Sequence, residues 1–425
     1  MRILVITRSS WKNDNNIGNT MTNIFKNFEN DEIYSLCFRS ELPQNDVAKA
    51  DFCISEQQII RYFTRKGKIG KIRTASEFGE SKKELEDKLY TGAKKNHSRL
   101  LWFAREILWS ISPWKNKMLD EYIDEVSPDI IFMPVFGCWY THKVLRYIMK
   151  RTTAKLVLFH ADDNYSLRQF SLSPVYWLYR FNLRKWVRNS VKLSSINYVI
   201  SEVQKNEYAK TFGKEFKILY KGYEFVDMPV GEETHTPIKL VFTGNISSGR
   251  YKQLASIGRA IADINKGEKK LELDIYTLTP MTTKMKNMLD IEGAVNLKGG
   301  VSADAIDSIQ KDADILIHVE SFDLRNRFAV HQSFSTKIVD YLHQAKCIFA
   351  VGPKDVASID YLLKNDAAIV ATTYDEIEKK LIELCTDINL INEYEKKSWE
   401  CGKHNHRIDE IQKNLDGDFK NLIVN

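Results

Sequence analysis

Ser333-Phe-Ser-Thr-Lys-Ile-Val-Asp-Tyr-Leu342 lies between two apolar runs, Ala313–Glu320 and Cys347–Pro353. Within the quoted stretch the apolar residues recur at the i, i+3, i+4 spacing of a helix. Both flanking runs have the length and composition of buried strands. The chain therefore runs strand, loop, helix, strand here, which is the repeating unit of an α/β domain.

The start of this helix has the chemistry of a phosphate site. Ser335 and Thr336 are small hydroxyl residues at a point where backbone N–H groups lack helical partners, and the helix dipole adds partial positive charge there. Lys337 adds a full charge, and Asp340, one turn further on, can accept hydrogen bonds from sugar hydroxyls. An ordinary capped helix needs the same residue types, so the spacing alone leaves both interpretations open.

The run Lys337-x-x-Asp340-Tyr-Leu, with a small-residue turn and a strand after it, resembles the donor loop of retaining GT-B glycosyltransferases. The most similar group is family 4, which builds bacterial surface and capsular polysaccharides. The resemblance extends over most of the chain and is strongest over residues 238–352. It implies an α/β GT-B fold: two Rossmann-like, doubly wound domains facing a cleft, with a C-terminal helix that crosses back to the first domain.

The family's two donor-site acids are separated by seven residues. Asp340 stands at the second position and Gln332 at the first, while Glu320 is the nearest upstream acid. Which of Gln332 and Glu320 takes the role of the first acid stays open. The resemblance also implies that Asp340 holds the ribose of a nucleotide and that the start of the helix holds its phosphates.

A polar segment with two prolines, residues 228–237, indicates the boundary between two domains. We expect an N-terminal acceptor domain over residues 1–230, interrupted by a helical insertion at about 61–125, and a C-terminal nucleotide-sugar donor domain over residues 238–400. Residues 401–425 are then the C-terminal helix that packs on the first domain.

The loop after the donor domain's first strand is the second half of the expected site. The resemblance implies that an arginine and a lysine from this loop clamp the donor diphosphate, and Lys252 matches the lysine. Where the family has a Gly-Arg pair, this chain has Gly244 and Asn245, and Arg250 is the expected replacement. Two cations facing a leaving diphosphate would stabilise the charge that develops there. A solvated loop has the same composition.

Two loops of the first domain supply candidates for the acceptor side of the cleft. Gly18 and Asn19 follow the first strand, but there is no G-x-G-x-x-G fingerprint, and a simple strand-to-helix turn has the same pattern. His160 and Asp162 stand at the carboxyl end of another strand, where ligands bind in open α/β sheets. The resemblance supports His160 as a catalytic group near the donor sugar. A histidine hydrogen-bonded within a loop is the alternative.

The composition predicts a cytoplasmic protein. Six scattered cysteines show no paired spacing, the first apolar run is too short for a signal peptide, and no run approaches the ~20 apolar residues of a membrane span. The net charge of +6 is mildly basic, which favours anionic partners without requiring nucleic acid. Asp312-Ala-Asp314 matches the metal-binding D-x-D pattern only in letters, because it lies at a strand entrance, so we expect no metal.

Residues 174–192 carry a basic stripe. Arg180, Arg184, Arg188 and Lys192 recur every four residues, and aromatic and aliphatic residues occupy another face of the same helix. This pattern fits an anionic bilayer surface, which would make the protein peripheral on the inner face of the cell membrane. A domain helix with its apolar face in the core and its basic face in water has the same pattern.

These features predict a glycosyltransferase that moves a sugar from a nucleotide-diphosphate sugar to a saccharide or lipid-linked acceptor, with no cofactor beyond the donor substrate. The resemblance implies retention of the anomeric configuration and a role in surface polysaccharide synthesis. A sugar-nucleotide epimerase would need acid/base carboxylates around the sugar, and a nicotinamide dehydrogenase would need the glycine fingerprint. A catalytically inactive binding subunit at the membrane is the alternative from another class.

Overall fold

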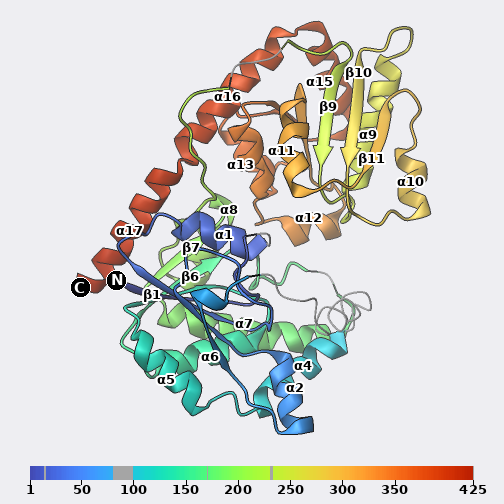
Figure 1. Cartoon of the computed structure of the whole chain (residues 1–425). Coiled ribbons are helices and arrows are strands. Elements are labelled where there is room, and N and C mark those ends of the chain that lie inside the picture. The colour runs from blue at the N-terminus through green and yellow to red at the C-terminus, as the bar shows by residue number, and fades with distance from the viewer. Residues whose placement is uncertain (14–15, 80–98, 170, 230–232, 425) are drawn as a thin grey trace. The chain divides into compact units, whose positions relative to one another are not determined.

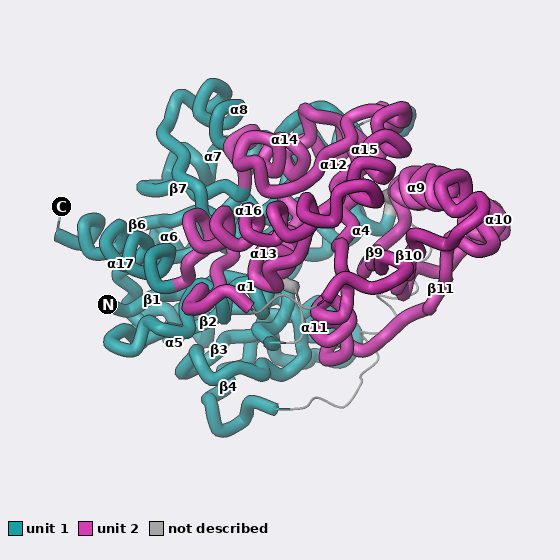
Figure 2. The backbone as a smooth tube through the Cα atoms, turned by 90° about the horizontal axis from the view of Figure 1, so that it is seen from above, with its two compact units in different colours: residues 1–200, 205–219, 409–425 teal, residues 201–204, 220–408 magenta. Residues whose placement is uncertain are grey.

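The computed structural model describes residues 1–13, 16–79, 99–169, 171–229 and 233–424 of the chain. It divides into two compact units, which Figure 2 shows in two colours. Unit 1 contains residues 1–200, 205–219 and 409–425, and unit 2 contains residues 201–204 and 220–408. The chain passes from unit 1 into unit 2 after Leu219, so the segment 228–237 lies inside unit 2, with residues 230–232 outside the described part.

Unit 1 is built, over its described residues, on an eight-stranded sheet with the order β4-β3-β2-β1-β5-β6-β7-β8. Its strands are β1 (Arg2–Thr7), β2 (Glu32–Cys37), β3 (Ala50–Cys53), β4 (Lys71–Thr74), β5 (Ile130–Pro134), β6 (Lys155–His160), β7 (Ile196–Val199) and β8 (Lys217–Ile218). Neighbouring strands are parallel except β3 and β4. Parallel sheets are covered on both faces, which explains why β1 and β5 are nearly continuous apolar runs.

Helices cover both faces of this sheet (Figure 1). They are α1 (Asn16–Phe25), α2 (Glu56–Arg65), α4 (Arg99–Ile111), α5 (Lys117–Val126), α6 (Trp139–Met149), α7 (Pro174–Leu193), α8 (Glu202–Phe212) and α17 (Ile408–Val424), with a short 3-10 turn at Ala75–Glu77. Successive residues of β1 point to opposite faces, so Leu4 and Ile6 enter one apolar core while Ile3 and Val5 enter the other.

The C-terminal helix α17 packs on unit 1. Phe419 is fully buried in the same core as Ile3. Asp418, beside it, accepts hydrogen bonds from Tyr198 Oη and Lys217 Nζ, each at 2.6 Å. The prediction that the C-terminal helix returns to the first domain is therefore confirmed.

The predicted insertion at about 61–125 contributes to the fold of unit 1 where it is described, and its residues 80–98 lie outside the described part. It supplies β4, an antiparallel edge strand that the sequence pattern did not reveal. It also supplies Glu106, whose buried carboxylate accepts hydrogen bonds from the first backbone N–H groups of α6, Trp139 N at 3.0 Å and Tyr140 N at 2.9 Å. Burial raises the pKa of Glu106 to about 7.

Unit 2 contains, over its described residues, a six-stranded parallel sheet with the order β11-β10-β9-β12-β13-β14. The strands are β9 (Ile238–Thr243), β10 (Leu271–Tyr276), β11 (Val295–Gly299), β12 (Ile315–Val319), β13 (Cys347–Val351) and β14 (Ile369–Ala371). In chain order this is the 3-2-1-4-5-6 arrangement of a doubly wound α/β domain. The predicted fold class is confirmed in both units.

The helices of unit 2 follow its strands along the chain. They are α9 (Arg250–Ile264), α10 (Thr283–Leu289), α11 (Ala303–Lys311), α12 (Leu324–Val330), α13 (Thr336–His343), α14 (Ala357–Lys364), α15 (Tyr374–Thr386) and α16 (Asn389–Asn405). The helix predicted from Ser333–Leu342 is α13. The segment 321–332, which connects β12 to α13, contains α12, which lies beyond the arrowheads of β9 and β10 in Figure 1.

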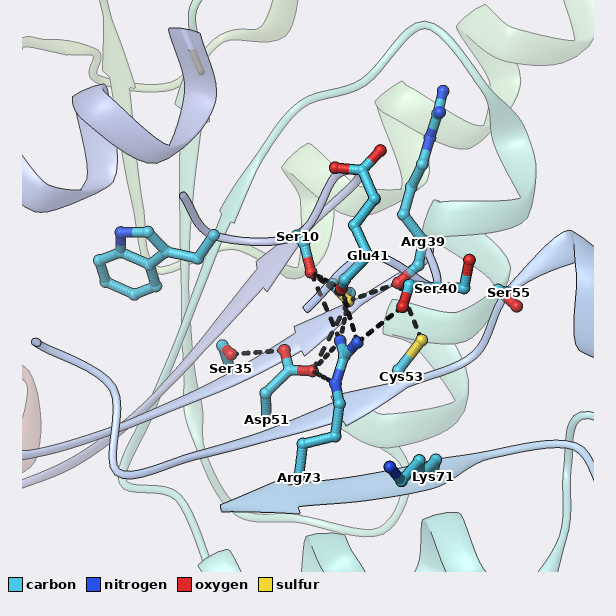
Figure 3. Close-up of polar contacts among 12 residues, drawn as sticks. Ser10, Ser35, Arg39, Ser40, Glu41, Asp51, Cys53, Ser55, Lys71 and Arg73 are labelled. Carbon is cyan, nitrogen blue, oxygen red and sulfur yellow. Dashed lines mark hydrogen bonds and ion pairs between the residues drawn. The ribbon is translucent and has the colours of Figure 1, made fainter. Parts of the chain in front are cut away.

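Arg73 of β4 is buried inside unit 1, where it forms hydrogen bonds to β3 and to the segment after β2 (Figure 3). Its Nε donates to Asp51 Oδ2 at 2.9 Å, and its Nη1 donates to the backbone oxygens of Ser40 at 3.1 Å and Glu41 at 2.6 Å. Asp51 accepts a further hydrogen bond from Ser35 Oγ at 2.6 Å. Each buried charge is therefore fully hydrogen-bonded, which a buried ion pair requires if it is not to destabilise the fold.

Replacing Arg73 by Met should lower the free energy of unfolding by ~3–5 kcal/mol, because Asp51 would be left as a buried charge without its partner. Lys71→Met in the same strand is the matched control, since the ion pair of Lys71 with Glu77 is exposed at 57% and 44%. We expect that change to cost less than ~1 kcal/mol. Urea unfolding of the two variants tests this, and equal losses would contradict it.

Candidate functional site

The candidate site lies in unit 2, where the strand order reverses between β9 and β12. Ligands of open α/β sheets bind outside the carboxyl ends of strands at such a switch point. The loop after β9 runs from Gly244 to Gly249, and the segment after β12 begins at Glu320. The first contains the predicted residues Gly244 and Asn245, and the second contains Glu320, which the sequence left as an alternative to Gln332. The helix α13 follows α12 at the same edge of the sheet.

Lys337 of α13 reaches the end of β9. Its Nζ donates to the backbone oxygen of Thr243 at 2.7 Å. This approach depends on Gly244, because a Cβ at that position would overlap Lys337 Nζ. Gly244 also has a φ of +143°, which a side chain disfavours. The glycine therefore makes the room that the ammonium group occupies.

Burial and charge weaken the basicity of Lys337. Burial is the main cause, and the nearby Arg250 guanidinium adds to it, so that the pKa of Lys337 falls to about 8. An amine with this pKa is still mostly protonated at neutral pH but loses its proton more readily than a surface lysine. A bound anion would restore the favourable environment for the charge.

Arg250 begins α9 and binds Glu320 in a two-pronged ion pair. Its Nη2 lies 2.9 Å from Oε1 and its Nε lies 3.2 Å from Oε2 of Glu320. Glu320 is only 3% exposed, and burial raises the pKa of its carboxyl group, against the influence of Arg250. The pair fixes the plane of the guanidinium at the carboxyl ends of β9 and β12.

His318 is a site residue that the sequence did not single out. It precedes Glu320 by two positions on β12, so both side chains point to the same face, and its Nε2 lies 3.8 Å from Glu320 Oε1. Burial lowers its pKa to about 3, with Arg250 and Lys337 as further causes. His318 is therefore neutral beside the two cations. A histidine inside an apolar run carries no sequence signal of this role.

The other two residues predicted after β9, Asn245 in the loop and Lys252 in the first turn of α9, have partners of their own. Lys252 Nζ lies 2.7 Å from Asp323 Oδ2. Asn245 Oδ1 accepts hydrogen bonds from Ser247 N at 2.7 Å and Thr279 Oγ1 at 3.2 Å. Asn245 therefore shapes the loop, and Lys252 connects it to the segment after β12.

At the start of α13, Ser335 is the N-cap residue, and its side chain makes no capping hydrogen bond to the helix. The backbone N–H of Ser335 donates to Ser358 Oγ at 3.0 Å. Thr336 is exposed. Gln332 is buried, and its backbone oxygen accepts a hydrogen bond from Ser201 Oγ at 2.8 Å.

Asp340 interacts with two residues that lie more than a hundred positions earlier in the chain. Its Oδ1 accepts hydrogen bonds from Lys221 Nζ at 2.6 Å and from Tyr223 Oη at 2.7 Å. Both bonds use the same carboxylate oxygen. No local sequence pattern could have connected Lys221 and Tyr223 with Asp340.

In unit 1, His160 lies in the core. It is 0% exposed, and its ring meets the ring of Tyr208 edge-on at 5.2 Å and that of Phe216 at 5.6 Å. Burial lowers the pKa of His160 to about 3, so the ring is neutral at physiological pH. Its predicted contact with substrate stays a prediction, and the described contacts are those of a packed core residue.

The remaining acceptor-side candidates are one buried glycine and two exposed polar residues. Gly18 is buried in α1, and a side chain there would overlap the backbone of Lys12, so glycine is needed for packing. Asn19 and Asp162 are exposed. Asp163, next to Asp162, is buried and receives hydrogen bonds from backbone N–H groups two and three residues ahead, at 3.0 and 2.7 Å.

The basic stripe predicted over residues 174–192 forms on α7, but it does not face outward as a whole. Arg180 is 6% exposed and donates through Nη2 to the backbone oxygens of Ser166 at 2.6 Å and Asp163 at 3.2 Å. The prediction of four outward cations is therefore wrong at Arg180, because the loop that follows β6 folds over this side of the helix.

Arg184 and Arg188 bind the same loop. The Arg184 guanidinium lies 4.0 Å from the centre of the Tyr165 ring, and Arg188 Nε donates to Tyr165 Oη at 2.9 Å. Most of the stripe thus stabilises unit 1 instead of facing a bilayer. Among the described residues, no helix is long and apolar enough to cross a membrane, and no three His, Cys, Asp or Glu side chains gather as metal ligands.

Comparison with known proteins supports the fold. No family model and no curated protein matches the chain. Anabaena HepE in complex with UDP is similar in structure, with a TM-score of 0.67 at 11% identity, over 99% of this chain and 100% of HepE. Sucrose-phosphate synthase from Thermosynechococcus elongatus gives a TM-score of 0.61 at 9% identity, over 99% of each chain.

A third similar structure is a point mutant of S. aureus TarM in complex with fondaparinux, α-GlcNAc-glycerol and UDP. It has a TM-score of 0.50 at 13% identity over 71% of this chain, which spans 58% of the TarM chain. At such low identities the likeness shows the fold alone. The GT-B fold predicted from the sequence is confirmed.

Gly244→Ala should displace the Lys337 ammonium group and raise its pKa from about 8 toward the ordinary 10.5, because the group would move into water. The measurement is the pH dependence of amine acylation at Lys337, followed by mass spectrometry.

Gly267→Ala is the matched control for this change. Gly267 also has positive φ, at +105°, but a Cβ there would meet nothing within 4 Å. Both variants carry a backbone strain of ~1–3 kcal/mol. Only Gly244→Ala should change the titration of Lys337, and an identical titration in both would show that the glycine does not position the lysine.

Proposed function

We propose that this chain is a glycosyltransferase that takes a sugar from a nucleotide-diphosphate sugar. The observation that carries the proposal is the meeting of Lys337 and Arg250 at the carboxyl ends of β9 and β12, with Gly244 leaving space for the lysine. Structures of similar fold hold matching ligands: Anabaena HepE holds UDP or UDP-glucose, and TarM holds UDP.

The two cations have the charge that the reaction requires. When the bond between the sugar and the diphosphate breaks, negative charge grows on the departing phosphate, and fixed positive groups stabilise it. Arg250 binds Glu320 through Nε and Nη2. The described residues place no hydrogen-bond partner on its Nη1, which is the atom that would contact the phosphate. Glu320 is then a positioning residue for the guanidinium.

Asp340 remains the proposed ribose ligand. Its bonds to Lys221 and Tyr223 both use Oδ1, so Oδ2 would accept hydrogen bonds from the ribose. Thr336 would contribute its backbone N–H group to the phosphates, and Ser335 its hydroxyl group, which makes no capping hydrogen bond. Gln332 cannot serve as an acid, which disfavours a sugar-nucleotide epimerase that needs paired carboxylates around the sugar.

The acceptor and the stereochemistry follow from the resemblance to family 4. It supports retention of the anomeric configuration, with the departing phosphate helping to deprotonate the acceptor hydroxyl on the same face. It also supports a lipid-linked saccharide acceptor in surface polysaccharide synthesis, on the cytoplasmic face of the membrane. Catalysis would rest on positioning and on charge stabilisation, without a cofactor.

The test combines ligand binding with turnover. Among UDP, GDP, ADP, CMP and NAD, we expect one of the three diphosphates UDP, GDP and ADP to stabilise the protein against heat, by ~2.7 kcal/mol at a hundredfold excess over Kd. The sugar nucleotide of that base should then be consumed with release of the free diphosphate. Lys337→Met should abolish the stabilisation and slow turnover by ~10²–10³-fold, as when one charge-stabilising donor is removed.

Lys239→Met is the matched control in the same unit, because Lys239 lies at the opposite end of β9 and pairs with Asp312. It should bind nucleotide normally. Stabilisation by NAD alone would overturn the proposal. Binding without any turnover would favour the inactive binding subunit, and a changed sugar still attached to nucleotide would favour the epimerase.

Nucleotide affinity should also fall as pH rises through about 8. Lys337 is protonated below this value and neutral above it, and a neutral amine no longer attracts the diphosphate. Above pH 8 the Kd should increase by up to about tenfold per pH unit, because binding then requires uptake of one proton. Titration calorimetry from pH 7 to 10 measures this, and a Lys337→Arg variant should show a flat profile. A flat profile in the unsubstituted protein would exclude Lys337 as the phosphate ligand.

A further inference from the structure

A second basic site lies in unit 1, at a pocket of about 480 Å³ between the end of α4 and the helices α6 and α7. Four cations line it: Lys115, Lys143, Arg146 and Lys150. Among the residues that the structure describes, no carboxylate lines it. On the described surface of the same unit, other lysines such as Lys49 pair with acids, so the absence of an acid here is a distinct feature of the pocket.

Aromatic rings and a hydroxyl group contact two of these cations, Lys115 and Lys143, in place of carboxylates. Lys115 Nζ lies 5.3 Å from the centre of the Trp114 ring and 5.7 Å from that of Tyr147. Lys143 Nζ lies 5.9 Å from the centre of the Trp186 ring and donates to Ser110 Oγ at 2.6 Å. Ring contacts orient an ammonium group without neutralising its charge. The pocket therefore keeps a positive potential suited to an anion.

The nearest acids are already bound. Asp120 accepts a hydrogen bond from Tyr147 Oη at 2.7 Å and pairs with Arg151. Glu106, which acts on Lys143 electrostatically, is buried against the backbone of α6. Burial lowers the pKa of Lys143 against the influence of Glu106, and the neighbouring Lys115 adds to the decrease.

Helix stability accounts for only part of this cluster. Arg146 and Lys150 lie in and just beyond the last turn of α6, where cations complement the helix dipole. Lys143 lies a turn earlier, and Lys115 belongs to the segment between α4 and α5. The dipole explains neither of these two, so they are the informative positions to change.

An exposed apolar edge borders the pocket. Ile107 and Ile111 are one turn apart on α4 and are 50% and 65% exposed. Ser110, which lines the pocket, is a surface neighbour of Ile107 at i+3, and Ile111 lies in the chain between the pocket residues Ser110 and Ser112. Leu101 is 47% exposed at the start of the same helix. A soluble phosphate compound would need the cations but not the isoleucines, whereas a phospholipid needs both.

We propose that this pocket binds the phosphate of an anionic phospholipid, with Ile107 and Ile111 in contact with the acyl region. Lys115 and Lys143 would contact the phosphate oxygens, and the partly exposed ring of Trp186 would lie at the level of the headgroups. The inference deepens the part of the proposed function that places the acceptor at a membrane. Its test uses no sugar nucleotide, so the two proposals can fail separately.

The test is flotation of the full chain with vesicles of phosphatidylcholine alone or mixed with phosphatidylglycerol. We expect binding to the mixed vesicles only. The double variant Lys115→Gln/Lys143→Gln should bind them about 30-fold more weakly, as expected for the loss of two cations at an anionic surface. Ile107→Ser/Ile111→Ser should also weaken binding. All four side chains lie at the surface or the pocket, and thermal unfolding checks that the variants fold.

Lys49→Gln/Lys71→Gln is the matched control, because it removes the same net charge from exposed ion pairs elsewhere in unit 1. Equal weakening in this control would overturn the pocket in favour of diffuse attraction, and failure to float with mixed vesicles would overturn it outright. Saturable binding of glycerol 3-phosphate without flotation would assign the pocket to a soluble phosphate instead. Lys337→Met should float normally, whatever its effect on nucleotide binding.

Discussion

The candidate site depends on one close approach between an ammonium group and a strand end. Lys337 Nζ occupies the space that a side chain at position 244 would fill, and it donates to Thr243, the last residue of β9. Two segments separated by 94 residues are thereby joined at the switch point of the sheet. A glycine with positive φ is the only residue type that gives both the chain turn and the space. The position of the lysine charge is thus set by backbone geometry and does not depend on a partner acid.

The second constraint is electrostatic. Arg250 lies close enough to Lys337 to weaken the hold of Lys337 on its proton, and the protein supplies one buried acid, Glu320, which binds the arginine. Burial and the two nearby cations keep the His318 ring neutral. The free site therefore carries more positive charge than its own acids neutralise, at the edge of a sheet where ligands bind. A dianionic diphosphate would relieve this imbalance, which is why binding and protonation of Lys337 should be coupled.

Much of the fold could be predicted from the sequence because the buried strands of a parallel sheet are continuous apolar runs. Gly244 and Lys337 were predicted as site residues from local signals, a glycine after a strand and a lysine near a helix start, and the structure brings these two residues together. The partners of Asp340 could not be found, because Lys221 and Tyr223 reach it only through the tertiary fold. Glu320 was left as an alternative to Gln332, and its role appeared only when its distance to the Arg250 guanidinium was known.

The basic stripe of α7 shows that periodicity in the sequence does not determine what a charged helix face contacts. A stripe of arginines every four residues is the same in sequence whether it faces water, a bilayer or a covering loop. On α7 the loop after β6 covers it, since Arg180 binds backbone carbonyls and Arg184 stacks on Tyr165. The cations of the pocket beside α4 come from two separate segments, and aromatic rings, not acids, lie against Lys115 and Lys143. The spacing of cations in the sequence therefore does not identify a surface that binds an anionic partner. The informative property is whether other groups of the fold already balance the charge of those cations.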